Sequence, residues 1–158
     1  MTPYGTGPAP APLLHTVTVA RPPDVTFALF TGGFGRWWPL STHSVGGPRA
    51  VAVRLGDSVG GQVVEAVADG PPVLWGTVTV WDPPYRVAFS WHPGTPEPEA
   101  TYVEVTFTRV DAATEVTLRH AGWANRPDGP AARERYARDW PLVLDHFTRA
   151  CAAADARQ

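Results

Sequence analysis

Residues 129–154 read GPAARERYARDWPLVLDHFTRACAAA, and their pattern is that of one long amphipathic helix. Apolar side chains recur every three or four residues, which places them on one stripe of a helix. They are Ala132, Tyr136, Trp140, Val143, Leu144, Phe147 and Cys151. Asp128 is a suitable N-cap, and Pro130 suits the first turn. Pro141 predicts a bend rather than a stop, because a proline removes one hydrogen bond from the helix.

A helix of about 25 residues would span about 37 Å, which is the width of a small domain. Its aromatic stripe needs a broad apolar surface, and the upstream sequence predicts that surface as a sheet. Strand patterns occupy residues 13–20, 50–55, 62–68, 73–81, 85–91, 102–110 and 115–120. Two short helical pieces, at residues 23–31 and 34–39, follow the first strand. Short turns between successive strands favour antiparallel pairing, so we predict a two-layer α+β fold.

The chain has 158 residues, enough for one domain with its own core. We expect a flexible N-terminal tail at residues 1–12, a single domain at 13–154 and a C-terminal tail at 155–158. The net charge of −2 and the pI near 6.2 argue against a nucleic-acid or membrane-surface binder. Neither a membrane-spanning run nor a signal peptide is recognisable, so we expect a cytoplasmic protein.

The sequence gives little support for a metal or an organic cofactor. The five histidines are widely spaced, and Cys151 is the only cysteine, so we expect no metal site and no internal disulfide. The glycine pairs lack the setting of a phosphate-binding loop. There is no lysine to form a Schiff base with a substrate. We therefore expect that the protein carries neither a metal nor a cofactor.

Several local stretches, in this order, resemble one known family. They are residues 34–39 (FGRWWP), 75–84 (WGTVTVWDPP), 89–91 (FSW), 116–123 (VTLRHAGW) and 136–147 (YARDWPLVLDHF). Together they resemble the helix-grip fold of the START-like, birch-pollen-allergen-like (SRPBCC) superfamily, in the branch named after the activator of the heat-shock chaperone ATPase. The resemblance covers about residues 13–153. The sequence differs from the family pattern at Asp139, where members of this branch often carry glycine, and at Pro141.

The resemblance implies a curved antiparallel sheet that wraps the long helix and leaves an apolar cavity between them. Because the superfamily has diverse activities, it implies a cavity more directly than a reaction. Three functions stay open: a carrier or sensor of a small apolar or aromatic molecule, a cavity enzyme of the cyclase or dehydratase type, and a module that interacts with a chaperone. We place ligand binding first, and we expect a monomer or a homodimer.

The seven tryptophans are the main candidates for a binding site. A tryptophan can simply fill the core, or it can line a pocket where its ring packs on a ligand and its N–H orients the ligand's polar end. For the strand at residues 73–81, alternation leaves the inward face undecided. Our candidate ligand-binding residues are Trp37, Trp38, Trp75, Trp91, His120, Trp123, Tyr136 and Trp140.

His120 is the most informative polar candidate, because it ends an apolar strand face. It is either a histidine at the edge of the core, hydrogen-bonded to backbone, or a polar anchor or acid–base group inside the cavity. Catalysis would require a partner, and Glu104 has the parity of the outer face. No other carboxylate is an evident partner, so we assign no catalytic residue.

Overall fold

The computed structural model describes residues 10–156 of the protein. The predicted N-terminal tail therefore lies almost wholly outside the described residues, as do the last two residues of the predicted C-terminal tail. The strands are β1 (Leu13–Val19), β2 (Ala50–Leu55), β3 (Gln62–Val67), β4 (Val73–Asp82), β5 (Arg86–Trp91), β6 (Thr101–Val110) and β7 (Ala113–Ala121). The helices are α1 (Pro23–Thr31), α2 (Phe34–Trp37) and α3 (Gly129–Ala156). This element order confirms the predicted α+β helix-grip fold.

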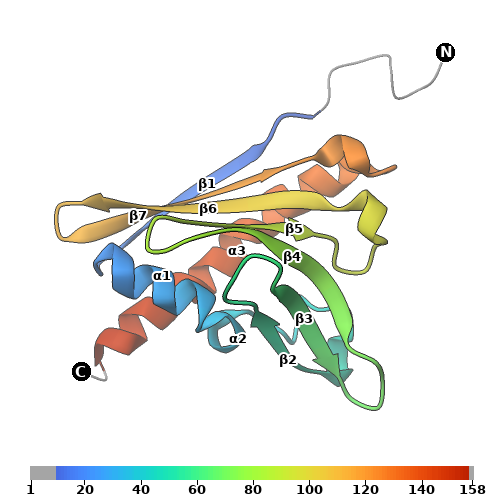
Figure 1. The fold of residues 1–158 in the computed structure, drawn as a ribbon, viewed down its shortest axis with the longest axis horizontal. Helices are drawn as coiled ribbons and strands as arrows, with labels where there is room; N and C mark the ends of the chain where they lie inside the picture. The colour runs from blue at the N-terminus through green and yellow to red at the C-terminus, as the bar shows by residue number, and fades with distance from the viewer. Residues whose placement is uncertain (1–9, 157–158) are drawn as a thin grey trace.

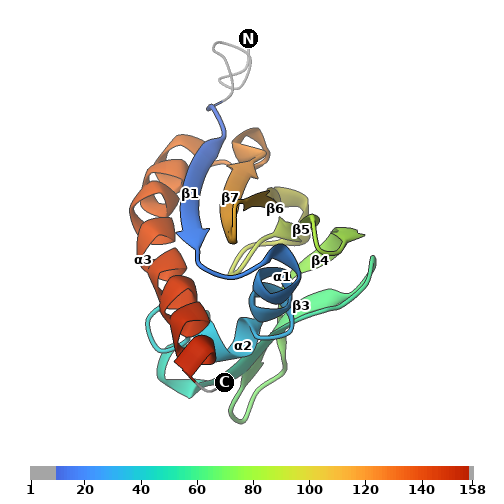
Figure 2. The same ribbon diagram turned by 90° about the vertical axis from the view of Figure 1, so that its left-hand side faces the viewer.

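The seven strands form one antiparallel sheet in the order β1-β7-β6-β5-β4-β3-β2. Strands that follow one another from β2 to β7 are neighbours, so that part is the meander which the short turns predicted. The first strand instead pairs with the last, with Leu13 opposite His120. Helices α1 and α2 connect β1 at one edge to β2 at the other (Figure 1). The sheet curls, and α3 crosses its inner side (Figure 2).

Helix α3 runs without interruption through Pro141 and ends two residues beyond the predicted Ala154. Its apolar stripe faces the sheet, as predicted. Trp140, Leu144 and Phe147 are each at most 3% exposed, and Ala132 and Cys151 are equally buried. Removing these side chains from water is what holds α3 on the sheet, because propensity alone contributes little to the stability of a helix in water.

Strand β4 contains two irregularities that decide which of its side chains point inward. Its pairing with β3 passes over Trp75, and its pairing with β5 passes over Thr79. Each extra residue reverses the alternation of faces, as a β-bulge does. Trp75 and Val78 can thus both be buried although their positions have opposite parity. Trp81 also turns inward, where its ring meets Phe27 of α1 edge-on at 5.2 Å. The bulges settle the orientation that the sequence left undecided.

The β6–β7 hairpin is tighter than predicted. The sequence indicated a four-residue turn at residues 111–114, whereas Val110 pairs with Ala113 and leaves only Asp111 and Ala112 in the turn. Asp111 adopts a left-handed conformation with φ of 56°, which aspartate tolerates better than most residues. The extra pairs lengthen β7 by two residues at its start, and Thr114 becomes fully buried.

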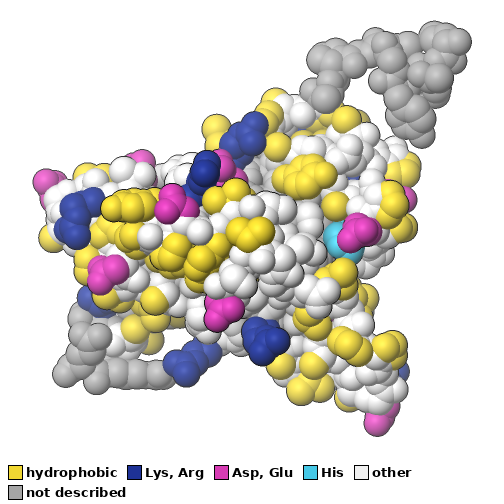
Figure 3. Space-filling view, in the orientation of Figure 1, with side chains coloured by type: hydrophobic (Ala, Val, Ile, Leu, Met, Phe, Trp, Pro, Cys, Tyr) yellow, Lys and Arg dark blue, Asp and Glu magenta, His cyan; other side chains and the backbone are white. Residues whose placement is uncertain are grey.

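The surface of the molecule mixes side-chain types. On the face drawn in Figure 3, acidic and basic side chains are scattered among apolar ones, and neither sign of charge forms a continuous field. Within residues 10–156, no helix combines the length and the apolar character that crossing a bilayer would need.

The burial of Trp140 generates a stability prediction. Trp140→Ala should lower the free energy of unfolding by about 3–5 kcal/mol, because it removes a large side chain from a packed core. Trp140→Phe should cost less, since it keeps an aromatic ring and loses mainly the indole N–H. Urea unfolding of the three proteins measures both differences. A loss below about 1 kcal/mol for Trp140→Ala would contradict the burial of this side chain.

Candidate functional site

A pocket of about 280 Å³ opens between α3 and the ends of β4 and β5. This volume lies at the lower end of the range of roughly 300–1,000 Å³ that is usual for small-molecule sites. We call it the aromatic pocket. It is lined by Trp38, His43, Ser44, Val45, Trp75, Trp91, Pro93, Arg126, Arg135, Tyr136, Asp139, Trp140 and Val143.

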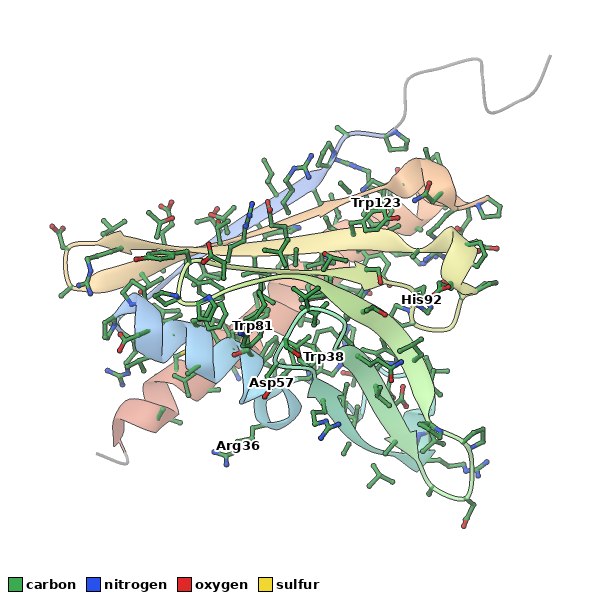
Figure 4. All side chains as sticks on the ribbon, in the orientation of Figure 1. Arg36, Trp38, Asp57, Trp81, His92 and Trp123 are labelled. Carbon is green, nitrogen blue, oxygen red and sulfur yellow. The ribbon has the colours of Figure 1, made fainter. Side chains whose placement is uncertain are left out.

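Five aromatic side chains from three parts of the chain form the walls. Trp38 follows α2, Trp75 and Trp91 come from β4 and β5, and Tyr136 and Trp140 lie one turn apart on α3. The ring of Trp38 is central, with centroids 5.4 Å from Trp75, 5.6 Å from Trp91 and 6.0 Å from Trp140. Figure 4 shows Trp38 beneath the sheet. Such tilted and edge-on contacts are favourable, so the rings fix one another in place.

Three of the eight predicted site residues lie behind these walls rather than on the pocket. Trp37 packs on Phe147 at 5.2 Å and donates its N–H to the carbonyl of Phe30 at 3.1 Å. Trp123 lies at the end of the sheet where α3 begins, and its N–H bonds the carbonyl of His120 at 3.1 Å (Figure 4). His120 itself is fully buried. All three are core residues in this structure, because their polar atoms already have protein partners.

The imidazole of His120 has a defined tautomer, since the direction of each neighbouring hydrogen bond is fixed. The indole N–H of Trp140 can only donate, so Nδ1 of His120 accepts it, at 2.9 Å. The hydroxyl of Thr101 donates to the carbonyl of Trp91 at 3.1 Å. The Oγ1 atom of Thr101 is thus left to accept from Nε2–H of His120, at 2.7 Å. His120 therefore joins α3 to β6 and, through Thr101, to β5.

Burial, with a smaller contribution from the positive charge of Arg126, lowers the pKa of His120 from its usual value to about 3. At neutral pH the ring is thus uncharged. Because both nitrogens are also occupied, His120 is a poor candidate for moving a proton to or from a ligand. The sequence left two interpretations of His120 open, and the structure fits a histidine of the core. Its hydrogen bonds go to the side chains of Thr101 and Trp140, not to backbone atoms as expected.

One polar side of the aromatic pocket is formed by Tyr136 and two arginines, Arg126 and Arg135. The indole N–H of Trp91 donates to the hydroxyl oxygen of Tyr136 at 3.1 Å. Burial raises the pKa of this hydroxyl, so it stays protonated at neutral pH. Arg126 and Arg135 both bind the carboxylate of Asp128, at 2.8 and 3.0 Å for Arg126 and at 3.1 Å for Arg135. The bond from Arg126 lowers the pKa of Asp128 to about 2. Asp128 also stands at the predicted N-cap position, where its backbone carbonyl accepts the N–H of Ala132 at 2.8 Å, while its carboxylate holds the two arginines.

Glu65 is a buried carboxylate that sequence reasoning missed. It is fully buried on β3, where it accepts the backbone N–H of Val45 at 2.9 Å, that of Gly46 at 2.7 Å and the indole N–H of Trp75 at 3.0 Å. These bonds tie the loop at residues 43–46, one wall of the pocket, to another wall. A signal was present, because Glu65 shares strand parity with the apolar Val63.

The loop and helix residues at the pocket mouth were also missed. Trp38 donates its N–H to the carbonyl of His43 at 2.6 Å, which fixes the loop against the ring. Nε2 of His43 lies 3.9 Å from a carboxylate oxygen of Asp139. Residues 43 and 139 are far apart in sequence, so no local pattern could indicate their proximity. Among residues 10–156, no three His, Cys, Asp or Glu side chains come together as a metal would require.

A curled sheet around a long helix, with an aromatic pocket between them, defines a helix-grip cavity protein. The sequence model of the family described as "Activator of Hsp90 ATPase homolog 1-like protein" matches residues 20–152, and the chain belongs to this family. This confirms the resemblance drawn from the sequence. Among curated proteins, none matches the chain.

Solved structures agree with this assignment. A protein described as an anthrahydroquino-γ-pyrone synthase is 28% identical, with a TM-score of 0.62, 90% of this chain covered and 97% of that one. The Aha1 dimer from Colwellia psychrerythraea is 18% identical, with a TM-score of 0.65 and coverages of 90% and 96%. Protein MLL2253 from Mesorhizobium loti is 15% identical, with a TM-score of 0.65 and coverages of 90% and 97%. At these two lower identities the likeness concerns the fold.

The lowered pKa of His120 predicts how stability changes with pH. In the unfolded chain the ring takes up a proton near pH 6.5, whereas in the folded protein it does so only near pH 3. The stabilisation is therefore complete above pH 6.5 and is lost as the pH falls toward 3, at up to about 1.4 kcal/mol per pH unit. Urea unfolding from pH 7 to pH 4.5 should show this slope, and it should be shallower in His120→Gln.

An NMR titration tests the same point without a variant. The ring-proton shift of His120 should stay constant between pH 8 and pH 5, whereas an exposed histidine changes charge in this range. A midpoint near pH 6.5 for His120 would show that the ring is not buried as described.

The role of Glu65 generates a further prediction. Glu65→Gln should destabilise the protein by about 1–3 kcal/mol, because the new amide turns a donor toward N–H groups that need an acceptor. The amides of Val45 and Gly46 should then exchange with deuterium faster. Glu104→Gln is the matched control, since Glu104 is partly exposed and contacts only Arg86 among the bonds described. Unchanged exchange at Val45 and Gly46 would mean that the loop is held by other contacts.

Proposed function

We propose that this protein binds a small aromatic or apolar molecule in the aromatic pocket. The observation that carries the proposal is the pocket itself, in which five aromatic side chains surround an opening between α3 and the sheet. Flat aromatic walls suit a ring that is held by contact, and the polar side chains in the lining supply groups that can orient it by hydrogen bonds. Of the predicted site residues, Trp38, Trp91, Tyr136 and Trp140 would touch the ligand, whereas Trp75 is fully buried and supports the wall behind them.

The structural neighbours support this class of ligand. The 28% identical neighbour is described as an anthrahydroquino-γ-pyrone synthase, a name that denotes a fused-ring compound. A second neighbour, 19% identical and with a TM-score of 0.63, is described as a putative protein of the dynemicin biosynthetic locus. The first lends weight to a fused-ring ligand, and the second shares the fold.

Catalysis in the pocket remains the alternative, although not through His120. That ring is neutral, fully bonded and behind the wall, so the expected acid–base role has no geometric support. The pair that faces the pocket is His43 and Asp139, but 3.9 Å between their nearest atoms is longer than a hydrogen bond. A catalytic pair would need to close this distance when substrate binds. Binding is therefore the function that the geometry supports better.

The family description also carries the chaperone alternative, which stays a prediction. The neighbour from Colwellia is described as a dimer, so a homodimer remains one of the two states expected for this chain. Both alternatives concern protein contacts rather than a small-molecule ligand.

The proposal predicts binding of the neutral probe N-phenyl-1-naphthylamine, whose emission rises in an apolar site. The probe should titrate to saturation with one site per chain. Trp91→Phe should weaken binding by about tenfold, because it shortens a wall and removes the N–H that orients Tyr136. The measurement is a fluorescence titration at constant protein concentration.

Trp81→Phe is the matched control for this experiment. Trp81 lies on β4, opposite Val87 of β5, packs on Phe27 and is not among the residues that line the pocket. This variant should bind the probe as the unaltered protein does, and thermal unfolding should show that both variants are folded. Absence of saturable binding, or equal loss in the two variants, would overturn the proposal.

A further inference from the structure

We propose that the ligand of the aromatic pocket carries an acidic oxygen group, a carboxylate or a phenolate, and that this group lies against Arg126 and the hydroxyl of Tyr136. The proposal rests on the proposed function and narrows it from aromatic molecules in general to aromatic oxyanions. Three observations carry it. One edge of the Arg126 guanidinium group has no hydrogen-bond partner among the described residues, the hydroxyl hydrogen of Tyr136 has no acceptor among them, and the charges around the pocket are unevenly distributed.

Arg126 is held in place with part of its guanidinium unused. Its Nε and Nη2 atoms bind the two carboxylate oxygens of Asp128 side by side, at 2.8 and 3.0 Å. This arrangement occupies one edge of the planar group and leaves the edge formed by Nη1 and Nη2 for a second acceptor. The side chain is only 8% exposed and lines the pocket. A fixed, nearly buried guanidinium edge matches the geometry of a carboxylate, which accepts two parallel hydrogen bonds.

Tyr136 supplies a donor beside this edge. The indole N–H of Trp91 already donates to the hydroxyl oxygen, so the phenolic hydrogen is directed away from Trp91. Among the described residues no acceptor for it is found, and the hydroxyl borders the pocket. Because burial raises the pKa of Tyr136, the group keeps its hydrogen and can donate it to a ligand oxygen. A neutral donor beside a cation is a setting that favours an oxyanion.

The charges that face the pocket favour an anion at this end. Arg126 and Arg135 share the carboxylate of Asp128, and Glu99 lies near enough to Arg126 to offset part of the remaining positive charge. The side chain of Asp128 is 45% exposed, so water screens its charge more than that of Arg126. The opposing carboxylate is Asp139, which is 47% exposed and lies on the side of His43. The site is thus positive at Arg126 and negative toward His43.

A cationic ligand is the main competing choice, because an aromatic cage can also hold an ammonium group over its rings. Here a cation would have to lie near the nearly buried guanidinium of Arg126, and repulsion would oppose it. A neutral ligand could pack on the same walls, but it would leave the second edge of Arg126 without a charged partner. The geometry therefore favours the anion over both.

The test compares two probes of the same shape, 1-naphthoate and 1-naphthamide, by isothermal titration calorimetry at pH 7.5. Naphthoate should bind at least tenfold more tightly, because only its head group is charged. Arg126→Gln should remove most of this preference. Arg126→Lys should keep part of it, because lysine has the positive charge but cannot form the two parallel hydrogen bonds of a guanidinium group. Asp139→Asn should tighten naphthoate binding severalfold, since it removes an opposing charge.

Arg138→Gln is the control for net charge. Arg138 is exposed on α3 and is not part of the pocket lining. Its replacement should therefore leave the preference for naphthoate unchanged. If Arg126→Gln fails to fold, the Asp139→Asn result decides, because Asp139 is exposed enough to be replaced safely.

Each remaining result has one meaning. Equal affinity for naphthoate and naphthamide would overturn the acidic-ligand proposal while ligand binding stands. Tighter binding of 1-naphthylmethylammonium would overturn it in favour of a cation. Failure of all three probes and of N-phenyl-1-naphthylamine would overturn the proposed function together with this inference.

Discussion

The interaction on which the structure depends most is the pair of hydrogen bonds at His120. One nitrogen accepts from Trp140 on α3, and the other donates to Thr101 on β6. Both bonds are buried, where a polar group without a partner costs more than a good bond gains. The helix can therefore rotate or slide on the sheet only by leaving these groups unpaired. This constraint fixes Trp140, and Tyr136 one turn away, in the positions that open the aromatic pocket.

The aromatic side chains divide into two groups, those of the core and those that line the pocket. Trp37 and Trp123 are buried outside the pocket lining, where their N–H groups bind backbone carbonyls and their rings fill space. Trp91 instead donates to the hydroxyl of Tyr136, which itself borders the pocket. The first group stabilises the domain, and the second provides a surface that a flat molecule can contact. Seven tryptophans in one small domain thus have distinct roles, which their shared chemistry does not reveal.

A second buried network prepares the mouth of the pocket. Glu65 accepts hydrogen bonds from two backbone N–H groups of the loop at residues 43–46 and from the indole N–H of Trp75. These bonds fix the loop against the sheet. At the other end, Asp128 holds Arg126 and Arg135. In both places a carboxylate positions the groups that would meet a ligand, and does not itself line the pocket. Such supporting contacts reduce the loss of conformational freedom when a ligand binds.

The sequence by itself determined the fold, because each element has a local cause. The stripe from Tyr136 to Phe147 requires a helix, the alternation in β5 to β7 requires strands, and short turns require antiparallel pairing. It also singled out five residues that the pocket brings together. Only the tertiary structure decided the rest. The bulges of β4 turned Trp75 and Trp81 inward, the buried bonds of His120 removed it from the candidate acids and bases, and folding brought Arg126 to the same pocket as Trp38. These outcomes depend on contacts between residues distant in sequence, and no local pattern encodes a distance of that kind.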